Sequence, residues 1–525
     1  MARPAQHEST GRHAFLVAAG IFLTRIIGFV RQRIFSRYFG LSDAADAFNA
    51  AFRIPNFLQN LFGEGVLSAS FIPVYARLLA EGDEEEAGRV AGAVAAILAL
   101  TTSVLVLLGV LATPYLIDAI APGFHGAKRE LTIRIVRILF PGAGLLVCSA
   151  WCLGILNSHR KFFLSYTAPV LWNLAMIGTL IGFRRMEQAS LAVTLAWGSV
   201  AGSGLQFGVQ LPVVLRLARH VRVRLETHRE QVREVIRNFV PVFISRGVVQ
   251  ISAYVDAWLA SWLGSGAVAG LTNAQTLYTL PVSLFGMSVS AAELPAMSSA
   301  LGEKDQVAAY LRQRLNSGLR QIAFFVVPSA MAFLALGGVV SSLLFENGRF
   351  THADSIYVWA IVAGSAVGLL ASTLGRLYSS TYYALRDTRT PLRFAVVRVA
   401  LTTGLGYLCA LPLPRWMGIA PRWGAAGLTV SAGIAAWMEF TLLRRTLNRR
   451  IGQTGLPVAL VTKLWASAAV AAAAGWGIKL VAGGRHPMVA GAAILAAYGV
   501  IYFGVTYVMQ VEECSLAVRR FVRLR

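Results

Sequence analysis

Long apolar stretches recur along the whole chain and are separated by short polar segments. A transmembrane helix needs about 20 consecutive, mostly apolar residues. Fourteen stretches fit this length, although closely spaced pairs could merge or split, so the count is good to about one. Their limits are 14–38, 45–79, 89–113, 131–156, 163–183, 190–216, 236–263, 270–299, 319–345, 355–384, 391–411, 423–447, 458–481 and 488–510. The pattern predicts an all-α polytopic membrane protein with about 14 transmembrane helices.

The composition agrees with this pattern. Hydrophobic residues make up 56% of the chain and charged residues only 14%, whereas soluble domains carry about 25% charged residues. Arg25 interrupts the first apolar stretch, and no small-residue cleavage site follows it. We therefore predict a retained first helix rather than a cleaved signal peptide.

The net charge of +23 is distributed unevenly among the predicted loops. With fourteen spans, both termini and every second loop share one side of the membrane, and this side holds most of the loop Lys and Arg. Its basic segments are the first twelve residues, 160–161, 216–237, 304–320, 385–393, 444–450 and the last seven residues. Because cytoplasmic loops are enriched in Lys and Arg, we predict that both termini are cytoplasmic. The basic loops are then contacts for anionic membrane lipids, and we expect no nucleic-acid partner.

The two halves of the chain share a weak repeat. Glu81 and Asp83 follow Pro73 at the end of the second predicted span. Glu303 and Asp305 follow Pro295 at the end of the eighth, at the same distances along the sequence. Duplicated transporter halves usually place the substrate between them near the middle of the membrane. We predict an N-terminal lobe of spans 1–6 (residues 1–217), a cytoplasmic amphipathic linker (218–235), a C-terminal lobe of spans 7–12 (236–450), and spans 13–14 with a basic tail (451–525).

The longest polar stretch, residues 216–238, is rich in arginine. It predicts either a basic amphipathic helix on the cytoplasmic membrane surface or a helical extension of the following span. The sequence leaves these two structures open.

Charged residues lie inside the first two predicted spans, where a charge costs several kcal/mol unless it faces a wet cavity or a partner. They are Arg25 and Arg31 in the first span, and Asp46, Arg53 and Glu64 in the second. Arg25 and Arg31 point about 120° apart on a straight helix, so a bend or unwinding at Gly28 would be needed to bring both into one cavity. Guanidinium groups match two oxygens of a phosphate or pyrophosphate at once. The pattern predicts a cationic interior that holds an anion; the alternative is a closed set of ion pairs in which Asp46 and Glu64 neutralise Arg25 and Arg53.

The second half of the chain adds charges in corresponding places. Arg246 and Asp256 lie ten residues apart in the seventh predicted span, near one helical face. Asp256 either binds a coupling ion or proton, or pairs with an arginine. Further charges within the spans are Glu293, Arg376 and Arg398.

No motif for nucleotide hydrolysis or covalent catalysis is present. The patterns G-x-x-x-x-G-K-[ST], G-x-S-x-G and H-E-x-x-H are all absent, and the four Cys and eight His show no metal-ligand spacing. The external loops are too short for a catalytic domain. We predict a transporter, not an enzyme, with no catalytic residues, metal or cofactor. Its energy would come from an ion gradient, the membrane potential or consumption of the substrate downstream.

The block DAFNAAFRIPNFLQNLFGEGVLSASFIPVYARLL, with TRIIGFVRQRIFSRYFG before it and APGF after it, resembles the MurJ/MviN family. Other segments that fit are LNSHRKFFLSYTAPVLWN, VDAWLASWLGSGAVAG, LPVSLFGMSVS, LFENGRFT and YYALRDTRTP. That family flips lipid II, the undecaprenyl-pyrophosphate-linked peptidoglycan precursor. The resemblance implies a fourteen-helix fold of the multidrug/oligosaccharidyl-lipid/polysaccharide exporter superfamily. It also implies a cationic cavity between two lobes and a groove for the lipid tail at spans 13 and 14.

The resemblance also assigns individual residues. Arg25 and Arg31 match arginines of the family's first helix, Asp46 the acid of its D-A-F motif, Arg53 the basic residue before the proline, and Glu64 the E-G glutamate. The chain departs from the family at Gln59-Asn60 and at Thr276, where arginines are expected. The anion site therefore has fewer arginines than the family pattern, and Arg246 is the candidate that supplies the missing positive charge.

These features predict a lipid II flippase of the bacterial cytoplasmic (inner) membrane that works by alternating access. The predicted substrate-binding residues are Arg25, Arg31, Arg53, Asp46, Glu64 and Arg246, and Asp256 is the ion-coupling candidate. The alternatives are a flippase for another polyprenyl-linked glycan, a drug/cation antiporter of the same fold, or a membrane glycosyltransferase. The expected partners are lipid II, membrane lipids and the cell-wall synthesis machinery, and we expect the protein to act as a monomer.

Overall fold

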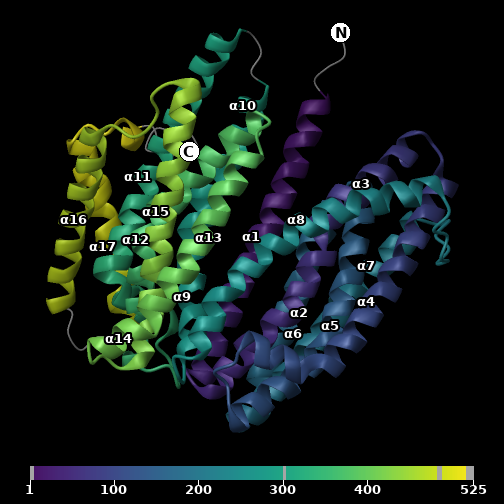
Figure 1. Ribbon diagram of the computed structural model, residues 1–525, viewed down its shortest axis with the longest axis horizontal. Coiled ribbons are helices and arrows are strands. Elements are labelled where there is room, and N and C mark those ends of the chain that lie inside the picture. Colours follow the sequence, from purple (N-terminus) through teal and green to yellow (C-terminus); the bar gives the residue numbers. More distant parts are fainter. Residues whose placement is uncertain (1–4, 300–302, 482–486, 516–525) are drawn as a thin grey trace. The chain divides into compact units, whose positions relative to one another are not determined.

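The computed structural model describes residues 5–299, 303–481 and 487–515, which fold almost entirely into helices joined by short loops (Figure 1). The predicted all-α polytopic membrane fold is confirmed. The chain divides into two compact units, Met1–Ser261 and Trp262–Arg525. The four-part division made from the sequence stays a prediction.

The first unit contains eight helices within its described residues. They are α1 (Ala5–Phe39), α2 (Asp43–Phe62), α3 (Glu64–Ala80), α4 (Glu84–Ile120), α5 (Gly126–Ser158), α6 (Phe162–Gly182), α7 (Gln188–Leu217) and α8 (Glu230–Ser261). Helix α5 packs against α2, α3, α4 and α7, and α6 packs against α1 and α7. A buried indole fixes one of these contacts, because Trp151 Nε1 on α5 donates to the backbone oxygen of Ala91 on α4 at 3.1 Å.

The second unit is built around α12, which packs against α9, α11 and α15. Its elements are α9 (Ala267–Pro281), a π-helix (Val282–Met287), α10 (Ser288–Ser298), α11 (Lys304–Phe345), α12 (His352–Ala384), α13 (Arg389–Ala410), α14 (Pro412–Trp416), a short 3-10 turn (Pro421–Trp423), α15 (Gly424–Ile451), α16 (Val458–Val481) and α17 (Pro487–Val508). Helices α16 and α17 pack on α11 (Figure 1). Tyr498 and Tyr502 of α17 each donate a hydrogen bond to a backbone oxygen of α11 at 2.7 Å, so their hydroxyls stay paired in an apolar setting.

Every predicted span coincides with a helix or with two consecutive helices. Within the described residues, ten stretches are long and apolar enough to cross a membrane. The other four predicted spans fall on α1, α2–α3, α7 and α8. Three of these contain the charged residues that suggested a binding site, and α7 contains buried Gln and Ser. Three of the four spans with lower hydropathy therefore contain the candidate site residues.

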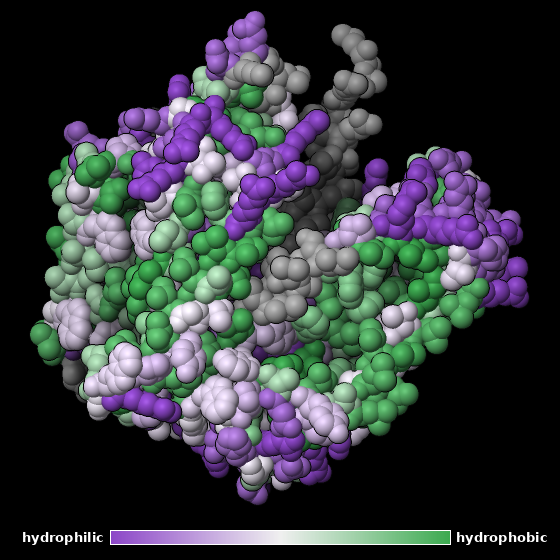
Figure 2. Space-filling model, viewed as in Figure 1, coloured by the Kyte–Doolittle hydropathy of each residue, from purple (hydrophilic) through white to green (hydrophobic). Residues whose placement is uncertain are grey.

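The surface agrees with a membrane setting. On the visible face of each unit, hydrophobic residues cover the middle and hydrophilic residues gather at the two ends (Figure 2). Exposed Leu100, Leu107, Leu108 and Leu111 on α4 are examples, each more than half accessible. Such side chains are expected where lipid replaces water as the solvent.

Residues 218–229 form no helix, so the predicted amphipathic helix is wrong over this segment. The alternative holds from Glu230, where α8 begins as a helical extension of the next span. The segment instead lies against α4, and a Cβ added to Gly92 would lie 2.0 Å from the backbone oxygen of Arg222. Only glycine lets the two backbones approach so closely.

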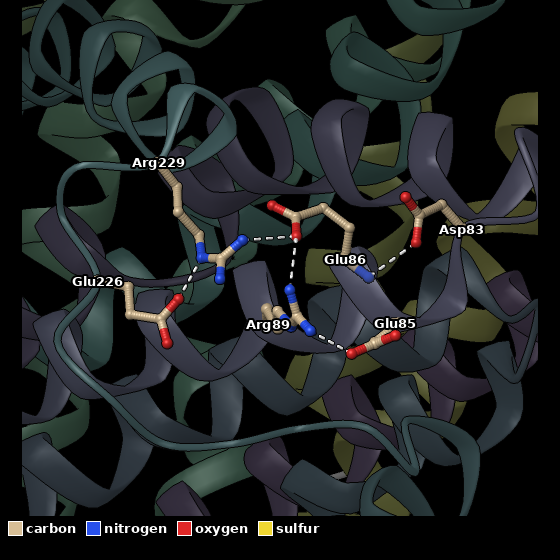
Figure 3. A network of polar contacts seen from close by, with 6 residues as sticks. All are labelled: Asp83, Glu85, Glu86, Arg89, Glu226 and Arg229. Atoms are coloured by element: carbon tan, nitrogen blue, oxygen red, sulfur yellow. Dashed lines mark hydrogen bonds and ion pairs between the residues drawn. The ribbon is translucent and has the colours of Figure 1, made fainter.

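Ion pairs fasten this segment to the start of α4 (Figure 3). Arg229 contacts Glu86 at 2.7 Å and also hydrogen-bonds Glu226, which lowers the pKa of the Glu226 carboxyl. Glu86 lies in the first turn of α4, and its backbone N–H donates to the side chain of the capping residue, Asp83, at 2.9 Å. The arginines that suggested an amphipathic helix therefore belong to an extended segment that joins α7 to α8.

Candidate functional site

The predicted second span is broken at Gly63, between α2 and α3. Gly63 has extended backbone angles, φ −86° and ψ −155°. A Cβ added there would lie 2.2 Å from the backbone oxygen of Gln59. The helix of this span is therefore interrupted at this glycine. The break sets the direction in which α3 leaves α2, next to the charged residues of the span.

We expect Gly63→Ala to destabilise the protein, because the methyl group must displace the last turn of α2. Overpacking of this kind costs about 1–3 kcal/mol. Gly178→Ala on α6 is the matched control, since a Cβ there meets nothing within 4 Å. Thermal unfolding of both purified variants measures the difference. Equal melting temperatures would contradict a steric requirement at Gly63.

Arg31 of α1 lies against aromatic side chains of two other helices. Its guanidinium carbon is 4.9 Å from the ring centre of Trp172 on α6 and 5.9 Å from that of Phe52 on α2. One of its Nη atoms points at Met176 Sδ, 3.8 Å away. Phe52 and Trp172 are themselves stacked at 5.6 Å. These groups hold a cation in place without using up its strong hydrogen-bond donors.

Among the described residues, no carboxylate lies within 4 Å of the Arg31 side-chain nitrogens. The side chain is only partly accessible. A partly buried guanidinium without a carboxylate partner is the arrangement expected of a group that receives an anionic ligand. Arg31, which was not part of the closed set of ion pairs considered from the sequence, therefore has no ion-pair partner among the described residues.

Arg25 lies six residues earlier on the same helix and is exposed. Helix α1 continues through Gly28, so the unwinding considered from the sequence does not occur. The neighbouring turn is fixed to α6 instead, because Thr24 Oγ1 donates to the backbone oxygen of Tyr166 at 2.9 Å. Arg25 and Arg31 therefore keep the offset of about 120° that a regular helix gives.

Arg53 of α2 is linked to α8. The hydroxyl of Tyr254 donates to the backbone oxygen of Arg53, and the Tyr254 ring packs edge-on against Phe57 at 5.6 Å. Asp256 lies close enough to attract the Arg53 guanidinium electrostatically. This geometry supports the interpretation of Asp256 as an arginine partner; its role as an ion-coupling residue stays a prediction.

Asp46 is completely buried at the start of α2 and forms an ion pair with Lys128 at 2.6 Å. Lys128 also reaches Asp43 at 3.0 Å, and its ammonium lies 4.3 Å from the ring centre of Phe124. Lys128 belongs to the first turn of α5, so the pair joins α2 to α5. This contact gives Asp46 a structural partner that the sequence analysis did not anticipate.

Two predicted site residues have side chains outside the described part of the structure. Glu64 is the first residue of α3, and Arg246 lies within α8. Their contribution to a site stays a prediction.

Two of the predicted span charges of the second unit, Glu293 and Arg398, have ion-pair partners, whereas Arg376 is exposed. Glu293 contacts Arg314 at 2.8 Å, and Arg398 contacts Glu439 at 3.0 Å. Thr276, where the family resemblance implies an arginine, donates to the backbone oxygen of Thr272 at 2.9 Å. Among the candidate arginines, the structure gives Arg31 aromatic and thioether contacts but no ion pair within the described residues.

Sequence reasoning missed the aromatic side chains around the arginines. Phe52, Trp172 and Tyr254 were treated only as apolar span residues. An aromatic residue beside a buried arginine is a recognisable signal when the two lie on one span, as Phe52 and Arg53 do. Trp172 lies more than 140 residues from Arg31 in the sequence, so only the fold brings them together.

The all-helical fold with membrane-spanning helices defines a polytopic membrane protein, and its first unit holds the Arg31 cation among apolar helices. Comparison with known proteins gives the family. The profile of the family described as lipid II flippase MurJ matches residues 35–495, and the chain belongs to this family of transporters. Family membership favours lipid II over other polyprenyl-linked glycans and over drugs as the substrate.

Individual relatives are similar in sequence to this chain along most of its length. A protein of Bdellovibrio bacteriovorus, described as "Probable lipid II flippase MurJ", is 32% identical over 97% of this chain and 98% of its own length. The "Lipid II flippase MurJ" of Burkholderia cenocepacia is 29% identical over 83% of this chain and 84% of its own length.

Solved structures show the same fold. A structure described as "Lipid II flippase MurJ, inward closed conformation" matches with a TM-score of 0.78 and 22% identity, over 94% of this chain and 98% of that one. An inward-facing multidrug resistance MATE family transporter of the MOP superfamily matches with a TM-score of 0.66 and 18% identity, over 83% of this chain and 98% of that one. The implied exporter-type fold is confirmed.

Proposed function

We propose that this chain moves lipid II from the inner to the outer leaflet of the bacterial cytoplasmic membrane by alternating access. Arg31 receives the pyrophosphate, and Arg53 adds positive charge from the neighbouring helix α2. The observation that carries this proposal is the partly buried Arg31 guanidinium, held by Trp172 and Phe52 without a carboxylate partner among the described residues.

The chemistry of Arg31 suits this role. Its guanidinium can offer two parallel N–H donors to two phosphate oxygens. Contact with aromatic rings fixes the plane of the group, so little side-chain entropy is lost when the anion binds. In a site shielded from bulk water, the attraction between cation and anion is stronger than it would be at a protein surface.

Arg53 differs from Arg31 because Asp256 attracts it. In the proposed cycle an arriving pyrophosphate competes with Asp256 for the Arg53 guanidinium. Release of Asp256 would couple substrate binding to the position of α8, and it would make Asp256 available to a proton or cation. Arg25, Glu64 and Arg246 are kept in the proposal as further binding residues on the strength of the family resemblance.

The test is restoration of outward transport in bacteria depleted of their own flippase. With this chain expressed, lipid II on the outer face of the membrane is expected to recover, as measured by its accessibility to an externally added probe, and growth is expected to resume. Native mass spectrometry of the purified protein is expected to show lipid II retained in preference to undecaprenyl phosphate. A well-expressed chain that restores neither accessibility nor growth would contradict the proposal.

A further inference from the structure

An open groove of about 720 Å³ lies on the first unit, along the N-terminal part of α5. The side chains that matter for its chemistry are Glu130, Leu131, Arg134, Arg137 and Ile138 of α5, and Trp197 of α7. With the termini cytoplasmic, as proposed, this end of α5 faces the outside of the cell. The sequence analysis did not single out either of these two arginines.

The groove lies at the boundary between the head groups and the hydrocarbon. Residues 138–158 of α5 contain no charge, and 21 helical residues span about 32 Å, close to the thickness of a hydrocarbon core of about 30 Å. Arg137 therefore marks the outer edge of the apolar layer. Trp197 is 59% exposed beside it, as is typical of tryptophan at a membrane interface.

The two arginines are available to a ligand. Both are exposed, and neither has an ion pair within the described residues. Glu130 contacts Arg129 at 3.2 Å, but Arg129 is already held by Asp118 through two contacts of 2.6 and 2.8 Å. The groove thus carries two unpaired guanidiniums and one exposed carboxylate.

These charges have an order along the helix. Arg134 comes four residues after Glu130, and Arg137 comes three residues after Arg134. The three side chains therefore share one face of α5. From outside to inside, the face presents a carboxylate, then two guanidiniums, then the apolar side chain of Ile138. An amine-bearing phospholipid has the complementary order: an ammonium outermost, a phosphodiester next, and acyl chains below.

We propose that the groove binds a phospholipid of the phosphatidylethanolamine type from the outer leaflet. Arg134 and Arg137 hold the phosphodiester, Glu130 accepts hydrogen bonds from the ammonium, and Trp197, Leu131 and Ile138 flank the glycerol and the first acyl carbons. One net positive charge matches a phosphodiester better than a pyrophosphate, which carries more negative charge. The site is therefore distinct from the one proposed for the transported lipid, which involves α1, α2 and α6.

Native mass spectrometry of the purified full-length protein tests this site. The protein is titrated separately with phosphatidylethanolamine, phosphatidylglycerol and phosphatidylcholine, and the lipid retained at each concentration is measured. The wild type is expected to retain phosphatidylethanolamine several-fold better than the other two, because only this head group offers both a phosphodiester and ammonium N–H donors.

Three variants separate the contributions. Arg134→Gln combined with Arg137→Gln is expected to reduce retention of all three lipids at least five-fold. Glu130→Gln is expected to remove the preference for phosphatidylethanolamine while leaving phosphatidylglycerol bound. Arg349→Gln, an exposed arginine of the second unit, is the matched control and is expected to change nothing. Single arginine substitutions replace the double variant if it unfolds.

Unchanged phosphatidylethanolamine retention in the double variant would overturn the proposal. It would also be overturned if lipid II displaced phosphatidylethanolamine from the wild type but no longer bound to the double variant, because the groove would then serve the transported lipid. Neither result depends on flipping, so failure here is distinguishable from failure of the proposed transport function.

Discussion

Arg31→Gln is expected to abolish complementation of a flippase-depleted strain. The substitution removes the charge and the guanidinium that contacts Trp172 and Phe52, while keeping an unbranched polar side chain. A hydrogen bond to a charged group contributes about 1.5–3 kcal/mol, so binding of the pyrophosphate lipid should weaken by about ten-fold to a hundred-fold. Retention of lipid II in native mass spectrometry measures this loss directly.

Two further variants show whether a loss of binding in Arg31→Gln comes from the guanidinium of Arg31 itself or from a general loss of positive charge. Arg31→Lys keeps the charge but loses the planar fork and its stacking, so we expect intermediate binding and slow growth. Arg37→Gln is the control on the same helix: Arg37 is exposed, and its nearest aromatic contact is the adjacent Tyr38 at 5.9 Å. Normal growth of Arg31→Gln at wild-type expression would refute a role for Arg31 in substrate binding, and an equal loss in Arg37→Gln would indicate a general effect of positive charge.

The sequence can single out Arg31 as a candidate because a charge inside an apolar stretch is costly unless it faces a partner or a wet cavity. The same logic singled out Arg53 and Asp256, which the structure brings within electrostatic range of each other. Helix positions were equally predictable, since apolar length alone defines them. What the sequence could not provide was the surroundings of Arg31, because Trp172 reaches it only through the packing of α6 against α1.

One wrong local prediction and one unanticipated contact have different physical origins. Residues 218–229 carry arginines at a density that suggests a membrane-surface helix, but the extended backbone lies on Gly92 and is held by the pair of Arg229 with Glu86. Tertiary contacts therefore override the local pattern. The substrate role of Asp46 stays a prediction, but its buried partner, Lys128, was not anticipated from the sequence.

The second large expected effect is a loss of stability when the Asp46–Lys128 ion pair is broken. Asp46→Asn removes a fully buried charge and leaves Lys128, whose side chain is only 13% exposed, with Asp43 as a remaining partner at 3.0 Å. Breaking one member of a buried pair costs about 3–5 kcal/mol, and the remaining contact with Asp43 should keep the loss near the lower end. Thermal unfolding of the purified protein measures it. Asp43→Asn is the matched control, since Asp43 is 62% exposed and a surface pair contributes only about 0–1 kcal/mol.

A double variant, Asp46→Asn with Lys128→Met, distinguishes a structural pair from a binding residue. Removing both charges takes away the uncompensated ammonium, so the double variant should regain much of the stability lost in Asp46→Asn. If Asp46 acts only through Lys128, transport should return together with stability. A double variant that is stable yet fails to complement would instead assign Asp46 to the substrate, as the family motif implies. Equal melting temperatures for Asp46→Asn and Asp43→Asn would contradict the buried pair itself.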